Sequence, residues 1–134
     1  MNMNPLIVNV RHAKGGFVYV GRAVRARGLA ESPYANPFPI TKTETRRRVL
    51  LDYIEHFIAQ VSANNTDFRP EVLSRLAGKR LGCWCAPEPC HAELVSIAAE
   101  LANEVLRGHR APESFPDVLR TAFQRWARSN LSEA

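Results

Sequence analysis

The stretch LGCWCAPEPCH, at residues 81–91, decides the fold, because it joins a predicted strand to a predicted helix through a tight loop. Residues 81–85 form a short apolar run, which is typical of a buried strand. Two prolines then predict the loop. From Cys90 or His91 to about residue 107, apolar residues recur at three- and four-residue steps and predict a long helix. A strand that passes at once into a helix is typical of an α/β fold.

Two further apolar runs lie upstream of this unit and predict two more strands. They are LIVNV at residues 6–10 and FVYV at residues 17–20. Residues 21–40 predict a long loop, since three prolines fall within residues 33–39. A loop of this length in a small domain is often functional.

Helical periodicity predicts further helices over residues 41–61, 70–77 and 117–129. Thr41 and Glu44 have the spacing of a capping box and predict the start of the first of these helices. Strands that alternate with helices favour an α/β fold with a small sheet, either Rossmann-like or mixed, flanked by helices. In such folds ligands bind where strands end and helices begin.

The length and composition fit one globular domain, residues 1–134, in which residues 110–134 form a C-terminal helical extension. No apolar stretch approaches the roughly 20 residues of a membrane helix, and the first five residues do not resemble a secretory signal. The three cysteines all lie within residues 83–90, so they do not link distant parts of the chain. We therefore expect a reduced, cytosolic protein, and we exclude membrane proteins, disulfide-stabilised miniproteins, solenoids and wholly disordered chains.

The charge is divided unevenly along the chain. Residues 1–50 carry nine basic and two acidic residues, whereas residues 51–134 carry nine basic and eleven acidic ones. Arginine supplies 15 of the 18 basic residues, and its guanidinium group suits bidentate recognition of phosphate. The basic half therefore indicates an anionic ligand, either a nucleotide or a nucleic-acid backbone. The run of three arginines at residues 46–48 fits either such a partner or a solvated helix face.

Cys83, Cys85, Cys90 and His91 form the strongest candidate site, with three interpretations. In the first they bind zinc, although a single residue between the first two cysteines is an unusual spacing. In the second, a helix start attracts an anion and lowers the pKa of a thiol, so that Cys90 or Cys85 is the nucleophile or ligand and His91 moves a proton. In the third, the cysteines are small buried hydrophobic residues and His91 caps the helix. Trp84 faces away from the neighbouring cysteines in the predicted strand, so we expect it in the core.

A second candidate site combines Asn9, Arg11, Gly21, Arg22 and Asn36. Arg11 and Arg22 each follow a predicted strand, and two guanidinium groups at one end of a sheet would clamp a phosphate. Asn36 lies in the long loop, where an asparagine before a proline holds a turn through its side chain. The alternative is that the two arginines are solvated strand ends.

These motifs together resemble an uncharacterised family, the domain-of-unknown-function family 4326 of bacteria and phages, over roughly residues 6–106. The resemblance rests on an Asn-x-Arg motif, a Tyr-x-Gly-Arg motif, an Asn-Pro-Phe motif and a Cys-Trp-Cys segment followed by Pro and Cys-His. In this chain they are Asn9 and Arg11; Tyr19, Gly21 and Arg22; Asn36, Pro37 and Phe38; and Cys83, Trp84, Cys85, Pro87, Cys90 and His91. The resemblance implies a small α/β domain with a shared pocket in a bacterial or phage setting, and it implies no activity.

We therefore expect a small protein that binds a nucleotide or modified nucleoside. As an enzyme it would catalyse hydrolysis or group transfer on that ligand. One alternative is a zinc-stabilised nucleic-acid-binding module without catalysis. Another is a phage accessory protein that binds a host protein through Arg120, Arg125 and Arg128 of the last predicted helix.

Overall fold

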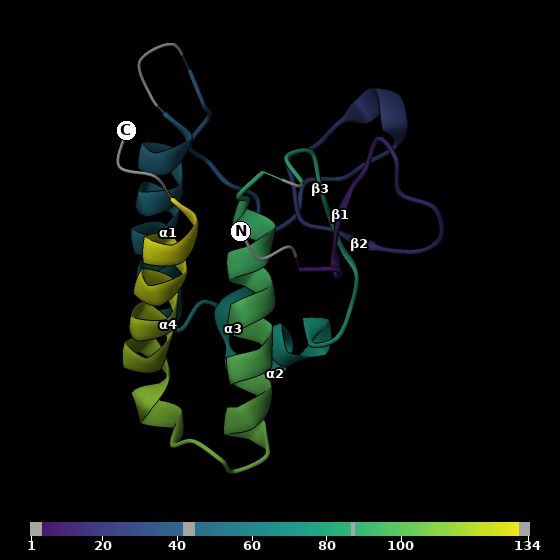
Figure 1. The fold of residues 1–134 in the computed structure, drawn as a ribbon. Helices are drawn as coiled ribbons and strands as arrows, with labels where there is room; N and C mark the ends of the chain where they lie inside the picture. Colours follow the sequence, from purple (N-terminus) through teal and green to yellow (C-terminus); the bar gives the residue numbers. More distant parts are fainter. Residues whose placement is uncertain (1–3, 42–44, 87, 132–134) are drawn as a thin grey trace.

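The computed structural model describes residues 4–41, 45–86 and 88–131, and Figure 1 shows its fold. Three short strands, β1 (Ile7–Asn9), β2 (Val18–Tyr19) and β3 (Leu81–Cys83), form one sheet in the order β1-β3-β2. Both outer strands run parallel to β3, which confirms the α/β prediction and makes the described sheet parallel. Because the strands are parallel, all three end at one edge of the sheet.

The sheet is small because its strands soon leave the ladder. The predicted strand over residues 81–85 ends at Cys83, where Val10 still donates its N–H to the Cys83 carbonyl over 2.8 Å. Beyond that point the Asn9 side chain replaces the missing strand partner. Its Nδ2 donates to the carbonyl oxygens of Trp84 (3.2 Å) and Ala86 (2.9 Å). Asn9 thus fixes the loop that follows β3.

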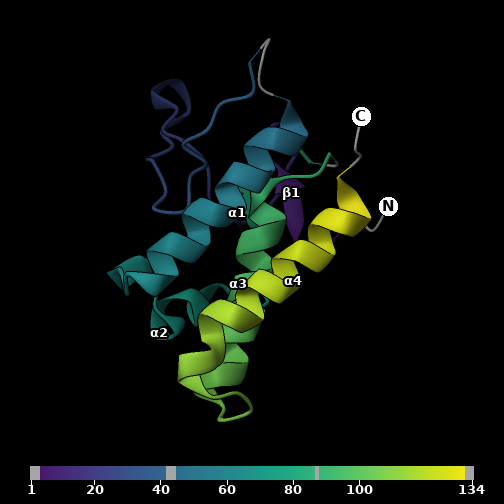
Figure 2. The ribbon, with the colours of Figure 1, turned by 90° about the vertical axis from the view of Figure 1, so that its left-hand side faces the viewer.

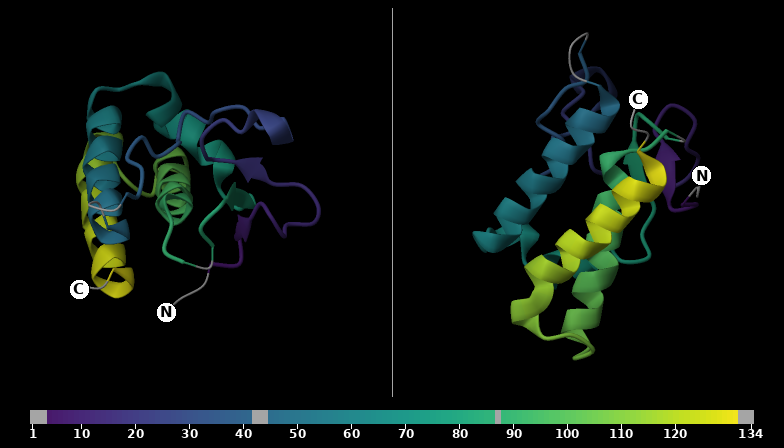
Figure 3. Two further views of the ribbon diagram at one scale, coloured as in Figure 1. Left: turned by 90° about the horizontal axis from the view of Figure 1, so that it is seen from above. Right: turned by 60° about the vertical axis from the view of Figure 1, so that its left-hand side comes forward.

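Four α-helices lie on one side of this sheet: α1 (Arg46–Ser62), α2 (Pro70–Leu73), α3 (His91–Leu106) and α4 (Phe115–Asn130). Seen from above, the sheet, α3 and the pair of α1 and α4 form successive layers (Figure 3). The pair packs together and covers the outer side of α3 (Figure 2). Four 3₁₀ turns complete the described elements: η1 (Arg25–Arg27), η2 (Thr66–Phe68), η3 (Ser74–Leu76) and η4 (Pro112–Ser114).

The core lies between these layers and is rich in aromatic rings. Phe57 of α1 contacts Phe123 of α4 and Phe68 edge-on, with ring centroids 5.4 Å and 4.9 Å apart. The apolar stripe predicted for the first long helix is the set of residues that α1 buries: Val49, Leu50, Tyr53, Ile54, Phe57, Ile58 and Val61. Helical periodicity therefore identified the packing face of α1 correctly.

The predicted start of α1 at Thr41 is wrong. The helix begins at Arg46, and Thr45 is its N-cap, with Oγ1 accepting the Arg48 N–H over 3.2 Å. The capping-box spacing favours Thr41, whereas the cap that forms is Thr45, which has Arg48 in place of an acidic residue three positions on. Glu44, the other half of the predicted capping box, lies outside the described residues.

None of the described helices is both long enough and apolar enough to cross a membrane.

Candidate functional site

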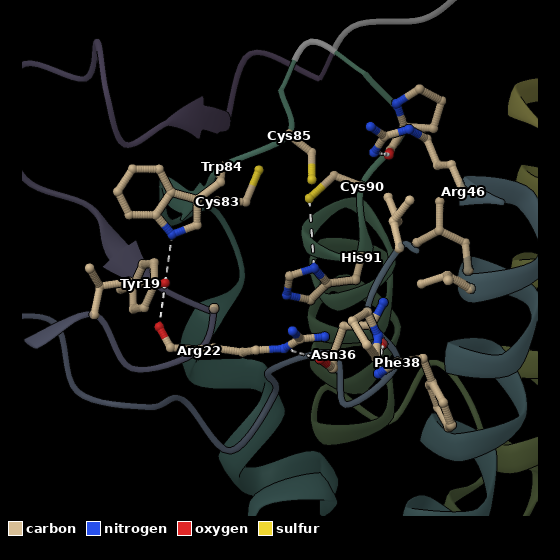
Figure 4. A pocket seen from close by; sticks show the side chains of 17 residues that line it. Tyr19, Arg22, Asn36, Phe38, Arg46, Cys83, Trp84, Cys85, Cys90 and His91 are labelled. Carbon is tan, nitrogen blue, oxygen red and sulfur yellow. Dashed lines mark hydrogen bonds between the residues drawn. The ribbon is translucent and has the colours of Figure 1, made fainter. Parts of the chain in front are cut away.

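A pocket of about 350 Å³ opens at the edge of the sheet where the strands end. It lies between β2, β3, the first turns of α1 and α3, and the long loop over residues 21–40 (Figure 4). The residues that line it are Tyr19, Gly21, Arg22, Val24, Asn36, Phe38, Pro39, Ile40, Arg46, Val49, Leu50, Cys83, Trp84, Cys85, Pro89, Cys90 and His91. Most of the wall is apolar or aromatic, while the polar groups are two guanidinium groups, thiols, an amide and an imidazole. Such a wall with few convergent polar groups is typical of a small-molecule site.

One wall is built by the Tyr-x-Gly-Arg motif. The Tyr19 hydroxyl donates to the Arg22 carbonyl over 2.5 Å and accepts from Trp84 Nε1 over 2.7 Å. Tyr19 folds back so closely over Gly21 that a Cβ there would lie 2.5 Å from the Tyr19 hydroxyl oxygen. Only glycine therefore allows this arrangement without a shift of the tyrosine.

The expected position of Trp84 in the core is wrong. Trp84 follows the last residue of β3, so the alternation of a strand no longer sets its direction. Its indole is half-buried, lines the pocket and meets the Tyr19 ring edge-on at 6.5 Å between centroids. The guanidinium carbons of Arg11 and Arg27 lie 5.7 Å and 5.2 Å from the centroid of the Trp84 ring. Trp84 is therefore an aromatic wall of the site with cations beside it.

The long loop forms the opposite wall through the Asn-Pro-Phe motif. Arg22 Nε donates to the Asn36 carbonyl over 2.8 Å, and Asn36 Oδ1 accepts the Phe38 N–H over 2.8 Å. The loop is anchored below by Tyr34, which is buried and whose carbonyl accepts from the Tyr53 hydroxyl. These bonds hold Arg22 at the pocket, and its two terminal nitrogens make no hydrogen bond to another described residue.

Arg46 is a site residue that the sequence analysis placed only in a cationic run. It stands in the first turn of α1 and donates from Nη1 to the Pro89 carbonyl over 3.2 Å. Its positive charge also lowers the pKa of the Cys85 thiol. Arg46 thus fastens the loop after β3 to α1, and it supplies the pocket with a second positive charge opposite Arg22 (Figure 4).

Three free thiols gather at the inner end of the pocket (Figure 4). Cys83 and Cys90 are 1% exposed, whereas Cys85 is half-buried and faces the cavity. The neighbouring Cys90 thiol, together with the Arg46 side chain, lowers the pKa of Cys85 to about 6 against the opposing effect of burial. Cys90 likewise lowers the pKa of Cys83.

The pKa of Cys90 is raised well above its usual range, because its proton is shared with the other two sulfurs and because it is buried. The expectation that a helix start lowers this pKa is therefore wrong for Cys90, and the depressed thiol pKa falls on Cys85. Cys90 is instead the N-cap of α3, where its sulfur accepts the Glu93 N–H and the Glu93 side chain accepts the Cys90 N–H.

His91 is buried at the first position of α3, and its ring is oriented by the backbone. Nε2 donates to the Val20 carbonyl over 2.7 Å, so the neutral ring keeps an unprotonated Nδ1. Nδ1 faces the Cys90 sulfur at 3.7 Å. Burial lowers the pKa of His91, so the ring is neutral at pH 7 and Nδ1 is a proton acceptor.

The four residues suggested as zinc ligands do lie together, but their arrangement gives zinc no support. Among the described residues, no group of three or more histidine, cysteine, aspartate or glutamate side chains could hold a metal ion.

Comparison with protein families matches most of the chain to one family. Residues 8–103 match the family described as Domain of unknown function (DUF4326). The chain belongs to the DUF4326 family. No curated protein and no solved structure matches it. The family match includes every residue that lines the pocket, and it ends before α4, although α4 packs against α1 and α3.

Within this DUF4326 site the structure brings together most of the residues predicted from sequence. Gly21, Arg22, Asn36 and the Cys83–Cys85–Cys90–His91 group all line the pocket, whereas Asn9 and Arg11 do not. The Asn9 side-chain amide hydrogen-bonds to the loop after β3. Asn9 also lines a separate hollow with His12, Ala86 and Glu88. The predicted pair of Arg11 and Arg22 does not line one pocket, because β3 and Trp84 lie between the ends of β1 and β2.

Proposed function

We propose that this pocket binds a nucleotide or modified nucleoside. The observation that carries the proposal is the combination of aromatic walls from Tyr19, Phe38 and Trp84 with two guanidinium groups, from Arg22 and Arg46, around one cavity. Aromatic rings stack on bases, and guanidinium groups form paired hydrogen bonds with phosphate oxygens. The volume of about 350 Å³ is near the lower end of ligand pockets, roughly 300–1,000 Å³, and suits a single small ligand.

The positions of the two arginines support a phosphate that lies between the long loop and the first turn of α1. Arg22 keeps its terminal nitrogens for a ligand, since its bond to the Asn36 carbonyl uses only Nε. Arg46 offsets the negative charge of the Cys85 thiolate, which would otherwise repel an anion. Arg22 is therefore the stronger phosphate contact of the two, because Arg46 also has to stabilise the Cys85 thiolate and bind the Pro89 carbonyl.

The thiol group supports processing of the ligand as well as binding. With a pKa of about 6, Cys85 is largely thiolate at pH 7 and half-open to the cavity, as a nucleophile must be. Cys90 holds a proton behind it, and neutral His91 offers Nδ1 as an acceptor. We assign Cys85 the role of nucleophile in hydrolysis or group transfer, with Cys90 and His91 as the proton-holding groups.

The test compares Arg22→Ala with Arg125→Ala, which removes an equal charge from an exposed position on α4. Both variants are made in a Trp126→Phe background, so that Trp84 is the single tryptophan, and are titrated with nucleoside monophosphates. We expect Arg22→Ala to weaken binding at least tenfold, because a charge-assisted hydrogen bond contributes about 1.5–3 kcal/mol, and Arg125→Ala to bind normally. Equal affinities in the two variants, or no nucleotide bound by the parent protein, would contradict the proposal.

A further inference from the structure

Beside Trp84, exposed arginines also lie outside the pocket. Arg11 follows β1, and Arg27 belongs to the 3₁₀ turn of the long loop. Neither lines the pocket, yet both guanidinium groups lie beside the ring of Trp84, which does line it. Trp84 is therefore shared between the cavity and a cationic surface outside it.

Within residues 4–41, 45–86 and 88–131, this cationic surface forms no ion pair. The described ion pairs join Arg48 to Asp52, Arg110 to Glu104 and Arg120 to Glu55, all of them on the helical side of the molecule. Among the described residues, none of Arg11, Arg22, Arg25 and Arg27 lies within 4 Å of a carboxylate oxygen. Residues 11–27 contain five basic residues and no acidic one. Unpaired arginines at this density favour a polyanion.

We infer that the nucleotide in the pocket is part of a single-stranded nucleic acid, whose adjoining nucleotides lie over Trp84, Arg11 and Arg27. The inference rests on the proposed function and extends it. A cavity of about 350 Å³ takes one nucleotide and leaves its neighbours outside. Trp84 can stack on an adjoining base and the arginines can bind the adjoining phosphates, since single strands bind through stacking on aromatic rings and through guanidinium contacts with phosphates.

A single strand fits these features better than a duplex. The cations lie around an aromatic ring and the mouth of a cavity. In a duplex the bases are stacked inside the double helix, so they can neither stack on this ring nor enter this cavity. The helical element beside Trp84 is the 3₁₀ turn Arg25–Arg27, which is too short to serve as a recognition helix.

The experiment measures binding of thymidine monophosphate, a fluorescent thymidylate decamer, a uridylate decamer, the same thymidylate decamer in a duplex, and polyglutamate. The test variant is Arg11→Ala/Arg27→Ala, and the control is Arg107→Ala/Arg125→Ala, which removes the same charge from exposed sites on the helical side. We expect the parent to bind a decamer at least tenfold more tightly than the monophosphate at 50 mM salt. In the test variant, decamer affinity falls about tenfold and the salt slope falls by about 1.4, two contacts at about 0.7 each. Its affinity for the monophosphate is unchanged, and the control behaves as the parent does.

The outcomes separate this inference from the proposed function. Normal monophosphate binding with no gain for either decamer, or decamer affinity unchanged in the test variant, would overturn the inference and leave the pocket assignment intact. Equally tight binding of the duplex or of polyglutamate would overturn it too, because the surface would then select charge alone. Decamer binding that depends on Arg11 and Arg27, without any monophosphate binding, would support the single-strand surface and contradict the assignment of the pocket to a nucleotide.

Discussion

The helical side and the strand-and-loop side of this molecule are held together in different ways. The helices α1, α3 and α4 pack through fully buried apolar side chains, and the ion pairs of the described residues lie on this side. Residues 7–40 contain only two short strands and depend on hydrogen bonds from side chains such as Asn9, Tyr19 and Arg22 to backbone carbonyls. Stability is thus concentrated on one side, while recognition groups with unpaired charges gather on the other.

The largest effect expected from this contrast is on stability, from the substitution Phe123→Ala in α4. Phe123 is fully buried against Phe57, so its removal leaves a cavity and lowers the free energy of unfolding by about 3–5 kcal/mol. Urea unfolding measures this loss, and the folded variant at low temperature retains its nucleotide affinity. The adjacent exposed Gln124→Ala is the control, with an expected change of less than about 0.5 kcal/mol. A loss of affinity in the folded Phe123→Ala protein would show that the two sides are coupled.

An intermediate effect is expected from Gly21→Ala on the strand-and-loop side. The new Cβ displaces Tyr19, and with it the bonds from Tyr19 to Arg22 and from Trp84 to Tyr19. We expect nucleotide affinity to fall about tenfold, while overpacking lowers the free energy of unfolding by only about 1–3 kcal/mol. Calorimetric titration and urea unfolding give the two values. In Gly16→Ala the added Cβ meets no atom within 4 Å, so this matched variant should bind as the parent does. Identical binding by Gly21→Ala would refute the role given to the Tyr-x-Gly-Arg motif.

The smallest effect is a shift in thiol reactivity with pH. The pKa of Cys85 is lowered to about 6. Its thiolate is therefore protonated as the pH falls below 6, and its ionisation is nearly complete at pH 7. The rate of alkylation of Cys85 by iodoacetamide should therefore rise between pH 5 and 7 and level off, whereas an ordinary thiol is only half ionised at about pH 8.5 and gains reactivity beyond it. Intact-protein mass spectrometry follows the reaction.

Two variants sharpen the thiol prediction. Cys85→Ser removes the reaction with its midpoint near pH 6, and Arg46→Gln moves that midpoint to higher pH because the thiolate loses a positive neighbour. A midpoint above pH 8 in the parent protein would show that Cys85 is not an activated nucleophile.

The same contrast explains what the sequence could predict. Helical periodicity identified the buried face of α1 and the start of α3, since an amphipathic helix records its environment every three or four residues. It also indicated the irregular loop, because prolines exclude regular structure. The predicted first turn of α1 is misplaced, since the capping-box spacing favours Thr41 while the cap that forms is Thr45, which lacks an acidic residue three positions on.

Within the site, motifs identified which residues matter more reliably than what each one does. Trp84 was assigned to the core because the strand was expected to reach Cys85, and its real direction depends on where β1 ends. Arg46 was missed because its bond to the Pro89 carbonyl joins segments that are distant in sequence. Arg11 was paired with Arg22 because the strand order, with β3 in the centre, is a property of the whole sheet.

The central position of β3 also sets the order in which the molecule is assembled. Ile7 pairs with Leu81 and Val18 pairs with the same residue from the other side, so neither outer strand has a partner until β3 is in place. During synthesis the segment with the long loop emerges first. Its strands have no partner until α1, α2 and then β3 have also emerged. The three thiols and His91 emerge together with β3, because Cys83 is the last residue of β3 and the others follow it closely. A chain that stops before β3 therefore lacks both the strand that pairs with β1 and β2 and the thiol wall of the pocket.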